Sequence, residues 1–378
     1  MSAALVTTSI YVPKLLEDYA LDAVATGHSD TVFVVIGDRK TPVEAKRWAL
    51  DLASRHGIPL EFLDCDDQVV YLRRFPELAD HLPWNSIQRR NIGLLRAFEL
   101  GCDPVITIDD DNFLLDADFV GLHSMAGMEV TLDSLNSSSG WVDVCRDLEE
   151  LRGVPFYHRG FPPGQRWKPQ ETTVGSRSGR VVVNAGLWLG DPDVDALQRL
   201  VYPVEVVRYR RDGNFALELG TWSPFNSQNT SLAREVLPAY FLSPRIGRFD
   251  DIWASYVVCR IADQLGHMIA FGQPLVRQER NPHDYWKDLD LEREPMQVSD
   301  RLCSHLRKIE LAGSDFGGCA REVADGLEAW VQDGEELNER EAELVAGFVS
   351  GLRVWQTTIS RVHEATVRNR AAGREPSR

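Results

Sequence analysis

The chain has 378 residues, and 43% of them are hydrophobic, which is enough apolar material for one large domain or two. Its formal net charge of -16 argues against a protein that binds nucleic acid or an anionic membrane surface, because either partner selects a basic face. The six cysteines form no C-x-x-C pair and no zinc spacing, and no apolar stretch reaches the roughly 18 residues of a membrane helix. We therefore expect reduced thiols in a cytoplasmic protein without a membrane span.

The first third of the chain alternates between short apolar runs and amphipathic stretches. Strands are predicted at residues 4–10, 31–38, 59–64 and 104–111, and helices at residues 13–25, 41–57 and 85–101. The second helix has Thr41 as its expected N-cap, Pro42 in its first position and Gly57 at its end. This order predicts an α/β fold with a mostly parallel sheet flanked by helices.

The rest of the chain is predicted in less detail. Residues 120–250 are irregular, with a strand and a helix start within 181–196, and a loop leads into an amphipathic helix within 245–266. From about residue 300 the pattern is helical, and the basic segment 366–378 is expected to be frayed. We expect a catalytic domain over residues 1–300 and a helical region over residues 301–378.

Polar and small residues stand at the carboxyl ends of the first three predicted strands. They are Thr8, Ser9, Gly37, Asp38 and Asp64. Ligands of open α/β sheets bind at these ends, so we expect the base and ribose of a nucleotide to lie over them. The chain has neither a G-x-G-x-x-G fingerprint after its first strand nor a P-loop, so a flavin or nicotinamide cofactor is not expected.

Three adjacent carboxylates, Asp109, Asp110 and Asp111, end the fourth predicted strand. Mg²⁺ and Mn²⁺ are bound through one or two carboxylates, with phosphate oxygens completing the coordination shell. The D-x-D spacing places Asp109 and Asp111 on one side of an extended chain. We expect these two residues to hold Mn²⁺ or Mg²⁺ and Asp110 to lie beside a nucleotide diphosphate. A solvated acidic turn is the alternative.

Arginines near this strand and in the middle of the chain suit phosphate recognition. Arg89 and Arg90 lie on the helix before the carboxylates, and Arg89 is favoured as a bidentate ligand of the diphosphate. Arg159 and Arg166 flank a Pro-Pro-Gly turn, which holds two guanidinium groups in a loop. Ordinary surface or loop arginines are the alternative for each.

Asp250 and Asp251 precede the predicted helix within 245–266. They either cap its N-terminus or accept a hydroxyl proton in an active site. His283, which follows Asn-Pro, is a candidate extra metal ligand.

Four motifs, in this order along the chain, resemble those of one family. They are TIDDDN, RGFPPGQR, GLWLGDPDVDA and RFDDIWASYVVCRIADQLG. The family is that of the reversibly glycosylated polypeptides of plants, the UDP-arabinopyranose mutases, and the resemblance spans roughly residues 5 to 300. It implies a variant of the GT-A glycosyltransferase fold. The chain is also similar to a bacterial branch in nucleoside-antibiotic pathways, the GDP-fucose and GDP-L-galactose mutases.

The chain departs from the family's motifs at several positions. Asn112 replaces a Cys, Trp167 and Lys168 stand where the family has Glu-Gly, and Arg277 and Gln278 occupy a segment where the family tends to have a His. The base-reading strand ends also differ from the plant pattern.

The resemblance implies pyranose–furanose interconversion of a nucleotide sugar, with GDP-fucose or GDP-L-galactose favoured and UDP-arabinose next. It implies that Arg159 and Arg166 act on the reacting centre, with Asp251 and Asp250 as carboxylates beside it. Two other functions stay open: a GT-A glycosyltransferase with a separate acceptor, and a non-catalytic scaffold of the same fold. A homo-oligomer is also left open.

Overall fold

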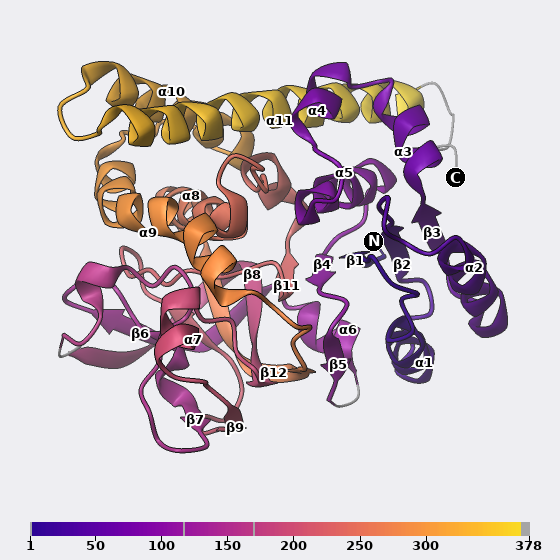
Figure 1. Cartoon of the computed structure of the whole chain (residues 1–378), viewed down its shortest axis with the longest axis horizontal. Coiled ribbons are helices and arrows are strands. Elements are labelled where there is room, and N and C mark those ends of the chain that lie inside the picture. Colours follow the sequence, from indigo (N-terminus) through magenta and orange to yellow (C-terminus); the bar gives the residue numbers. More distant parts are fainter. Residues whose placement is uncertain (1, 116–117, 169–170, 372–378) are drawn as a thin grey trace.

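Four parallel strands form one half of the central sheet (Figure 1). The computed structural model describes residues 2–115, 118–168 and 171–371. The four strands lie side by side in the order β3-β2-β1-β4, and most of their residues are buried, as in other parallel sheets covered by helices. Their bounds are β1 (Ala4–Thr8), β2 (Val32–Ile36), β3 (Leu60–Leu63) and β4 (Val105–Ile108).

Helices join these strands, with α5 on one side of them and α1 on the other (Figure 1). Gly93 lets α5 lie directly on β1, since a Cβ at this position would stand 2.5 Å from Cγ1 of Val6. The short helices α3 and α4 were not predicted. The helix bounds are α1 (Leu16–Ala25), α2 (Glu44–His56), α3 (Cys65–Leu72), α4 (Pro76–His81) and α5 (Arg90–Leu100).

Beyond β4 the sheet is mixed. β11 pairs antiparallel with both β4 and β8, and the long strand β8 also pairs antiparallel with β6 and parallel with β12. The expected α/β class is confirmed, but parallel pairing dominates only from β3 to β4. Among the described residues between β4 and β11 the helices are short, and parallel neighbours require a long crossover, so most strands there pair antiparallel. The bounds are β5 (Asn112–Leu114), β6 (Glu129–Ser137), β7 (Leu148–Glu150), β8 (Thr172–Gly190), β9 (Val206–Tyr209), β10 (Phe215–Leu217), β11 (Asn229–Leu232) and β12 (Met268–Gln278).

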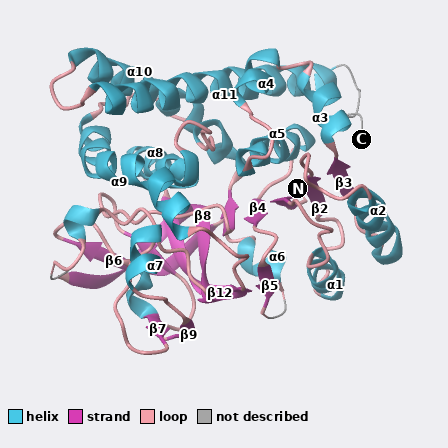
Figure 2. Cartoon of the chain, viewed as in Figure 1, coloured by secondary structure: helices cyan, strands magenta, loops and turns pink. Residues whose placement is uncertain are grey.

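A layer of long helices covers the sheet, as Figure 2 shows above the strands. The helical C-terminal pattern is confirmed, and its first helix begins well before residue 300. The indole nitrogen of Trp355 on α11 donates to the Leu237 carbonyl at 2.7 Å, and the Trp253 ring on α8 packs edge-on against Phe348 on α11. The bounds are α6 (Phe119–His123), α7 (Ala196–Val201), α8 (Asp250–Leu265), α9 (Tyr285–Lys308), α10 (Phe316–Asp333) and α11 (Glu339–Ala371).

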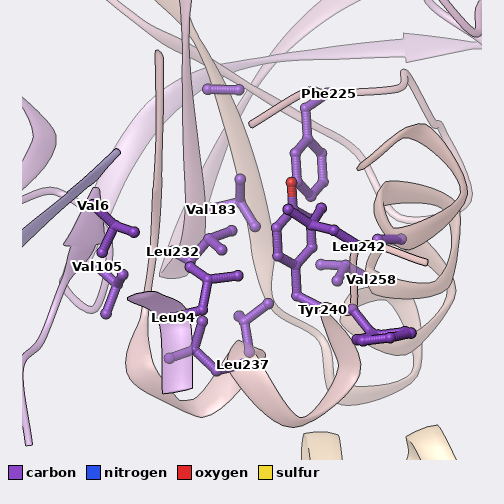
Figure 3. Close-up of a cluster of buried hydrophobic side chains, with 14 of the residues drawn as sticks. Val6, Leu94, Val105, Val183, Phe225, Leu232, Leu237, Tyr240, Leu242 and Val258 are labelled. Atoms are coloured by element: carbon purple, nitrogen blue, oxygen red, sulfur yellow. The ribbon is translucent and has the colours of Figure 1, made fainter. Parts of the chain in front are cut away.

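One hydrophobic core joins the sheet to these helices. Figure 3 shows Val105 of β4, Val183 of β8 and Leu232 of β11 beside Leu94 of α5 and Val258 of α8. The same cluster includes buried side chains of α10 and α11. Helix α9 runs through residue 300, and the division of the chain at that position stays a prediction.

Thr41 is not the N-cap of α2, which begins at Glu44. The Thr41 hydroxyl donates to the Ser9 carbonyl at 2.7 Å and accepts from the Asp38 amide at 2.6 Å, so it ties the ends of β1 and β2 together. Gly57 ends the helix in the left-handed region at φ 67°, as predicted.

The cysteines, the hydropathy of the helices and the C-terminal segment were also the subject of predictions. The six cysteines are free thiols, as predicted. Among the described residues, no helix combines the length and the apolar composition that crossing a bilayer would take. Helix α11 continues to Ala371, so the frayed segment predicted from residue 366 is helical at its start, and the remainder, residues 372–378, lies outside the described residues.

Candidate active site

Two adjoining cavities open at the carboxyl ends of β1, β2 and β4. The first, of about 270 Å³, holds the three carboxylates that follow β4, and we call it the acidic cavity. The second, of about 350 Å³, lies over the ends of β1 and β2, and we call it the strand-end cavity. The two share five lining residues: Thr8, Ile87, Asp110, Asn281 and His283. One extended ligand can therefore occupy both.

The strand-end cavity contains most of the predicted nucleotide-binding residues. Thr8, Ser9, Gly37 and Asp38 line it, as expected for strand-end positions. The Asp38 carboxylate accepts from the Ser86 amide at 3.0 Å, which holds the segment before α5 against the end of β2.

Arg89 lines the strand-end cavity but does not contact the acidic triplet. Its Nε donates to Gln68 at 2.6 Å, and its guanidinium lies 3.5 Å from the centre of the Trp84 ring. Burial lowers the pKa of Arg89 to about 10. The arginine on the triplet is Arg90, whose Nη2 donates to Asp109 at 2.5 Å. Arg90 is therefore the arginine in contact with the triplet, and the role of Arg89 as a bidentate ligand of the diphosphate stays a prediction.

The carboxylates of the triplet point to different partners. Asp110 accepts from the Ser9 hydroxyl at 2.8 Å, and Asp111 accepts from the Asn281 amide at 3.4 Å. Burial, followed by the charge of Asp109, raises the pKa of Asp111 to about 6. Cavity-lining carboxylates at this position suit a hard divalent cation.

These carboxylates supply part of the coordination shell that a metal ion needs. Within the described ranges, no group of three His, Cys, Asp or Glu residues is arranged to hold an ion. Mg²⁺ and Mn²⁺ do not require such a group, because substrate phosphates and water complete a shell begun by one or two carboxylates. His283 lines both cavities, and its Nδ1 lies 2.9 Å from Asp288, which leaves Nε2 as the ring nitrogen that can meet an ion.

A buried ion network forms another part of the wall of the acidic cavity. Arg159 Nε donates to Asp193 at 2.9 Å, and its Nη2 donates to both oxygens of Asp251 at 3.0 and 3.1 Å. Burial alone would raise the pKa of Asp193, but the Arg159 guanidinium outweighs it and holds this pKa well below its ordinary value. Asp251 also accepts from the Ser227 amide at 3.0 Å. Arg159 is therefore fixed by charge on two sides.

Asp250 differs from its neighbour although both lie in the first turn of α8. The cap position belongs to Phe249, so neither aspartate caps the helix. Asp250 accepts from Gln88 Nε2 at 2.8 Å. Burial and the charge of Asp251 raise the pKa of Asp250 to about 7. It can therefore exchange a proton near neutrality, whereas Asp251 is held by Arg159.

Arg166 does not line either cavity, contrary to its predicted place beside Arg159. Its Nη2 donates to Asp195 at 2.5 Å, and Asp195 also caps α7. The intervening residues Pro163–Gln165 form a 3₁₀ turn, and the side chain beyond it is drawn to the buried Asp195 carboxylate.

Asp64 also lies outside both cavities. Its carboxylate accepts from the Asp67 amide at 3.0 Å as the N-cap of α3, and it pairs with Lys46 at 2.7 Å. A polar residue at the end of a strand can bind a ligand or cap the next helix, and Asp64 caps α3.

Several residues of the acidic cavity were not predicted. Asp193 and Arg248 lie inside motifs that carried the family resemblance, so their position was a usable signal. Arg280 directly precedes the Asn-Pro-His segment, but no motif in the sequence indicated that it would line the cavity.

Comparisons with known proteins agree with the motifs. The family model described as "Reversibly glycosylated polypeptide" matches residues 173–359, which include the third and fourth motifs. UDP-arabinopyranose mutase 3 of Arabidopsis thaliana is 28% identical over 266 residues, which cover 63% of this chain and 69% of that protein. The named homologues of this chain are UDP-arabinopyranose mutases.

Two more comparisons describe the range of similarity. Probable UDP-arabinopyranose mutase 1 of Zea mays is 34% identical over 178 residues, which cover 46% of each chain. Among solved structures, the mannosyltransferase PcManGT from Pyrobaculum calidifontis, in complex with GDP-Man and Mn²⁺, is 12% identical with a TM-score of 0.36, and the alignment covers 97% of this chain and 86% of that one. A TM-score of this size says nothing about the site.

Replacing Asp64 by Ala should separate capping from nucleotide binding. We expect the free energy of unfolding to fall by about 1 kcal/mol, because α3 loses its cap. The affinity for UDP or GDP should not change, because Asp64 lines neither cavity. Chemical denaturation and calorimetric titration measure the two quantities, with Asp66→Ala in the same helical turn as the control. Weakened nucleotide binding at unchanged stability would return Asp64 to the nucleotide site.

Proposed function

We propose that this chain is a metal-dependent mutase that interconverts the pyranose and furanose forms of a nucleotide sugar. The main support is the acidic cavity, which is lined by both the carboxylate triplet and the buried Arg159–Asp251 pair and which shares five lining residues with the strand-end cavity. The activity named for the homologues agrees with this proposal. In it, residues 1–300 form the catalytic part.

The charge of the acidic cavity supports the metal requirement. Among the described residues it is lined by six aspartates and four arginines: Asp109, Asp110, Asp111, Asp193, Asp250, Asp251, Arg90, Arg159, Arg248 and Arg280. An anionic diphosphate is repelled by an excess of carboxylates unless a cation accompanies it. We propose Asp109 and Asp111 as ligands of Mn²⁺ or Mg²⁺, with His283 as a further ligand. When bound, the ion would supply positive charge that stabilises a departing diphosphate.

The base and ribose are proposed to lie in the strand-end cavity, over Thr8, Ser9, Gly37 and Asp38, with Arg89 at its border. We favour a GDP-sugar, GDP-fucose or GDP-L-galactose, over UDP-arabinose. Guanine offers two adjacent N–H donors to a carboxylate such as Asp38, whereas uracil offers one.

The reaction requires the ring oxygen on C1 to change. The C1–O(phosphate) bond breaks, and its electron pair leaves with the diphosphate. Asp251 then lies next to the positive charge on C1, while the ion pair with Arg159 orients this carboxylate. No electron is transferred to or from a cofactor.

Asp250 is proposed to carry the proton between the two sugar oxygens. O4 attacks C1 and gives its proton to the Asp250 carboxylate, the C1–O5 bond breaks, and O5 takes the proton back. A diphosphate oxygen then bonds to C1 again, which completes the furanose. Both aspartates were candidates to accept a hydroxyl proton, but Arg159 and Ser227 occupy Asp251, and the pKa of Asp250 near 7 suits exchange in both directions.

The direct test supplies each nucleotide sugar without an acceptor. We expect GDP-fucose, and more slowly UDP-arabinopyranose, to form the furanose in the presence of Mn²⁺, as followed by chromatography. Asp111→Ala should lose this activity and bind the nucleotide more weakly. Turnover that needs an added acceptor would identify a glycosyltransferase, and no turnover of any nucleotide sugar would favour a scaffold. Full activity in excess EDTA would remove the metal from the proposal.

Arg159→Lys and Arg166→Lys form a matched pair, since each keeps the charge and loses the guanidinium fork. We expect Arg159→Lys to lower kcat on the order of 10²-fold or more, comparable to the loss of an oxyanion donor, with a much smaller effect on nucleotide affinity. Arg166→Lys should keep a kcat near that of the wild type and lose thermal stability, because it holds Asp195 outside the cavity. Steady-state kinetics and thermal unfolding measure both, and equal kcat losses in the two variants would contradict this assignment.

The raised pKa of Asp250 gives a pH dependence. Its carboxylate accepts the O4 proton in the ionised form, so kcat should fall as the pH decreases through about 7. Asp250→Asn should turn over slowly and lack this limb of the profile.

The free energy of unfolding should depend on pH in the opposite direction to kcat, and should fall as the pH rises. A carboxyl with a raised folded pKa stabilises the fold in its protonated form, and this contribution is lost as the pH rises from 3.8 to about 7. Asp250→Asn, which stays neutral, should therefore gain stability relative to the wild type between pH 4 and pH 8. Equal pH dependence of unfolding in both proteins would contradict the raised pKa.

A further inference from the structure

Arg280 is a buried arginine in the acidic cavity without a close partner. It follows β12, its side chain is 8% exposed, and it lines the cavity. Within the described part of the chain its Nε has no hydrogen-bond partner. Its nearest carboxylates are those of Asp191 at 3.7 Å and Asp193 at 3.8 Å, both beyond hydrogen-bond length.

These two carboxylates already have closer donors. Asp193 accepts from Arg159 at 2.9 Å and from Asn226 at 2.7 Å, and Asp191 accepts from Arg199 at 2.5 Å. Closer pairing with Arg280 would compete with these bonds. A buried guanidinium that lacks a hydrogen-bonded partner is costly, so its position indicates a ligand that supplies the missing negative oxygen.

We propose that Arg280 binds a phosphate oxygen of the nucleotide diphosphate in the acidic cavity. This rests on the proposed function only in that a nucleoside diphosphate occupies the cavity. Arg280 adjoins Asn281, whose amide donates to Asp111, so it stands next to the proposed metal end of the site. Once the C1–O bond has broken, the diphosphate carries more negative charge than one divalent ion neutralises, and a guanidinium fork matches the remaining phosphate oxygens.

The surroundings favour an anion over a neutral sugar hydroxyl. Burial and the neighbouring Arg199 lower the pKa of Arg280, Asp193 and Asp191 raise it, and Arg248 lowers it. Two arginines thus repel the Arg280 guanidinium, while its two nearest carboxylates are bound by closer donors. An incoming phosphate would offset that repulsion, which a hydroxyl would not.

The binding role also has a consequence for the reaction. While C1 is detached, the diphosphate must stay in the cavity to be recaptured. A guanidinium bound to it needs no proton transfer to hold it there. Arg280 is therefore placed to retain the leaving group.

The test compares Arg280→Gln with Arg277→Gln, which removes the same charge three residues earlier, at a position that lines neither cavity. The probes are GDP and UDP, with guanosine and uridine as phosphate-free references, in calorimetric titrations with Mn²⁺ and with EDTA. We expect Arg280→Gln to weaken diphosphate binding about ten-fold or more under both conditions, as for a lost charge-assisted hydrogen bond. Nucleoside binding should stay within about two-fold of the wild type, and Arg277→Gln should bind every probe as the wild type does.

Thermal unfolding of the ligand-free proteins controls for folding. Arg280→Gln should be no less stable than the wild type, because the buried guanidinium that it removes has only two ion pairs, at 3.7 and 3.8 Å, to offset the cost of its burial. Lower stability together with equal weakening of nucleosides and diphosphates would make Arg280 a structural residue and overturn the proposal. Unchanged diphosphate affinity would overturn it as well.

The outcomes separate this inference from the mutase proposal. If the wild type binds GDP or UDP through Arg280 but forms no furanose, the mutase proposal fails and the role of Arg280 stands. If it forms the furanose and Arg280→Gln binds normally, only the role of Arg280 fails. Binding of neither nucleoside diphosphate by the wild type would contradict both.

Discussion

The ion network of Arg159 with Asp193 and Asp251 is the interaction on which the site depends. It joins three segments of the chain: the loop before the Pro-Pro-Gly turn, the segment between β8 and α7, and the first turn of α8. The three groups are buried, so each charge needs its partner, and removal of one from a buried pair typically costs about 3–5 kcal/mol. The network thus fixes the wall of the acidic cavity before any ligand arrives.

The sheet supplies another wall of the cavity. Parallel pairing of β1, β2 and β4 brings their carboxyl ends to one edge, and Gly93 lets α5 lie close enough for Arg90 to reach Asp109. The charged groups of the cavity differ in how closely they are paired. Arg159 has short ion pairs, whereas Asp111 accepts a long hydrogen bond from the Asn281 amide and Arg280 lies 3.8 Å from Asp193. The groups with the weakest partners are therefore those assigned to the metal and the diphosphate.

Much of this arrangement could be predicted from local patterns. Apolar runs, and glycines at the ends of helices, predicted the parallel half of the sheet. Because ligands bind at the carboxyl ends of such strands, Ser9, Asp38 and Asp110 were expected to lie together, and all three line the strand-end cavity. Adjacent helical residues point about 100° apart, so the choice between Arg89 and Arg90 depended on the rotation of α5, which no local pattern records.

Other features depended on partners far away in the sequence. Asp193 matters because of Arg159, 34 residues earlier, and Arg166 is drawn from the cavity by Asp195, 29 residues later. The motifs singled out these residues, but they did not predict which partner each side chain would contact. The mixed half of the sheet was missed for a similar reason, because strand pairing in it joins segments without regular connections.

Positional isotope exchange tests most directly whether the sugar leaves and returns to the diphosphate. The substrate is GDP-fucose with ¹⁸O in the bridge between C1 and the diphosphate, incubated with the protein and Mn²⁺ without an acceptor. The proposed mechanism predicts that the label moves into non-bridging phosphate positions as the furanose forms, because the freed phosphate can return through any of its equivalent oxygens. Furanose that forms while the label stays entirely in the bridge would contradict cleavage of the C1–O bond, and with it the proposed mechanism.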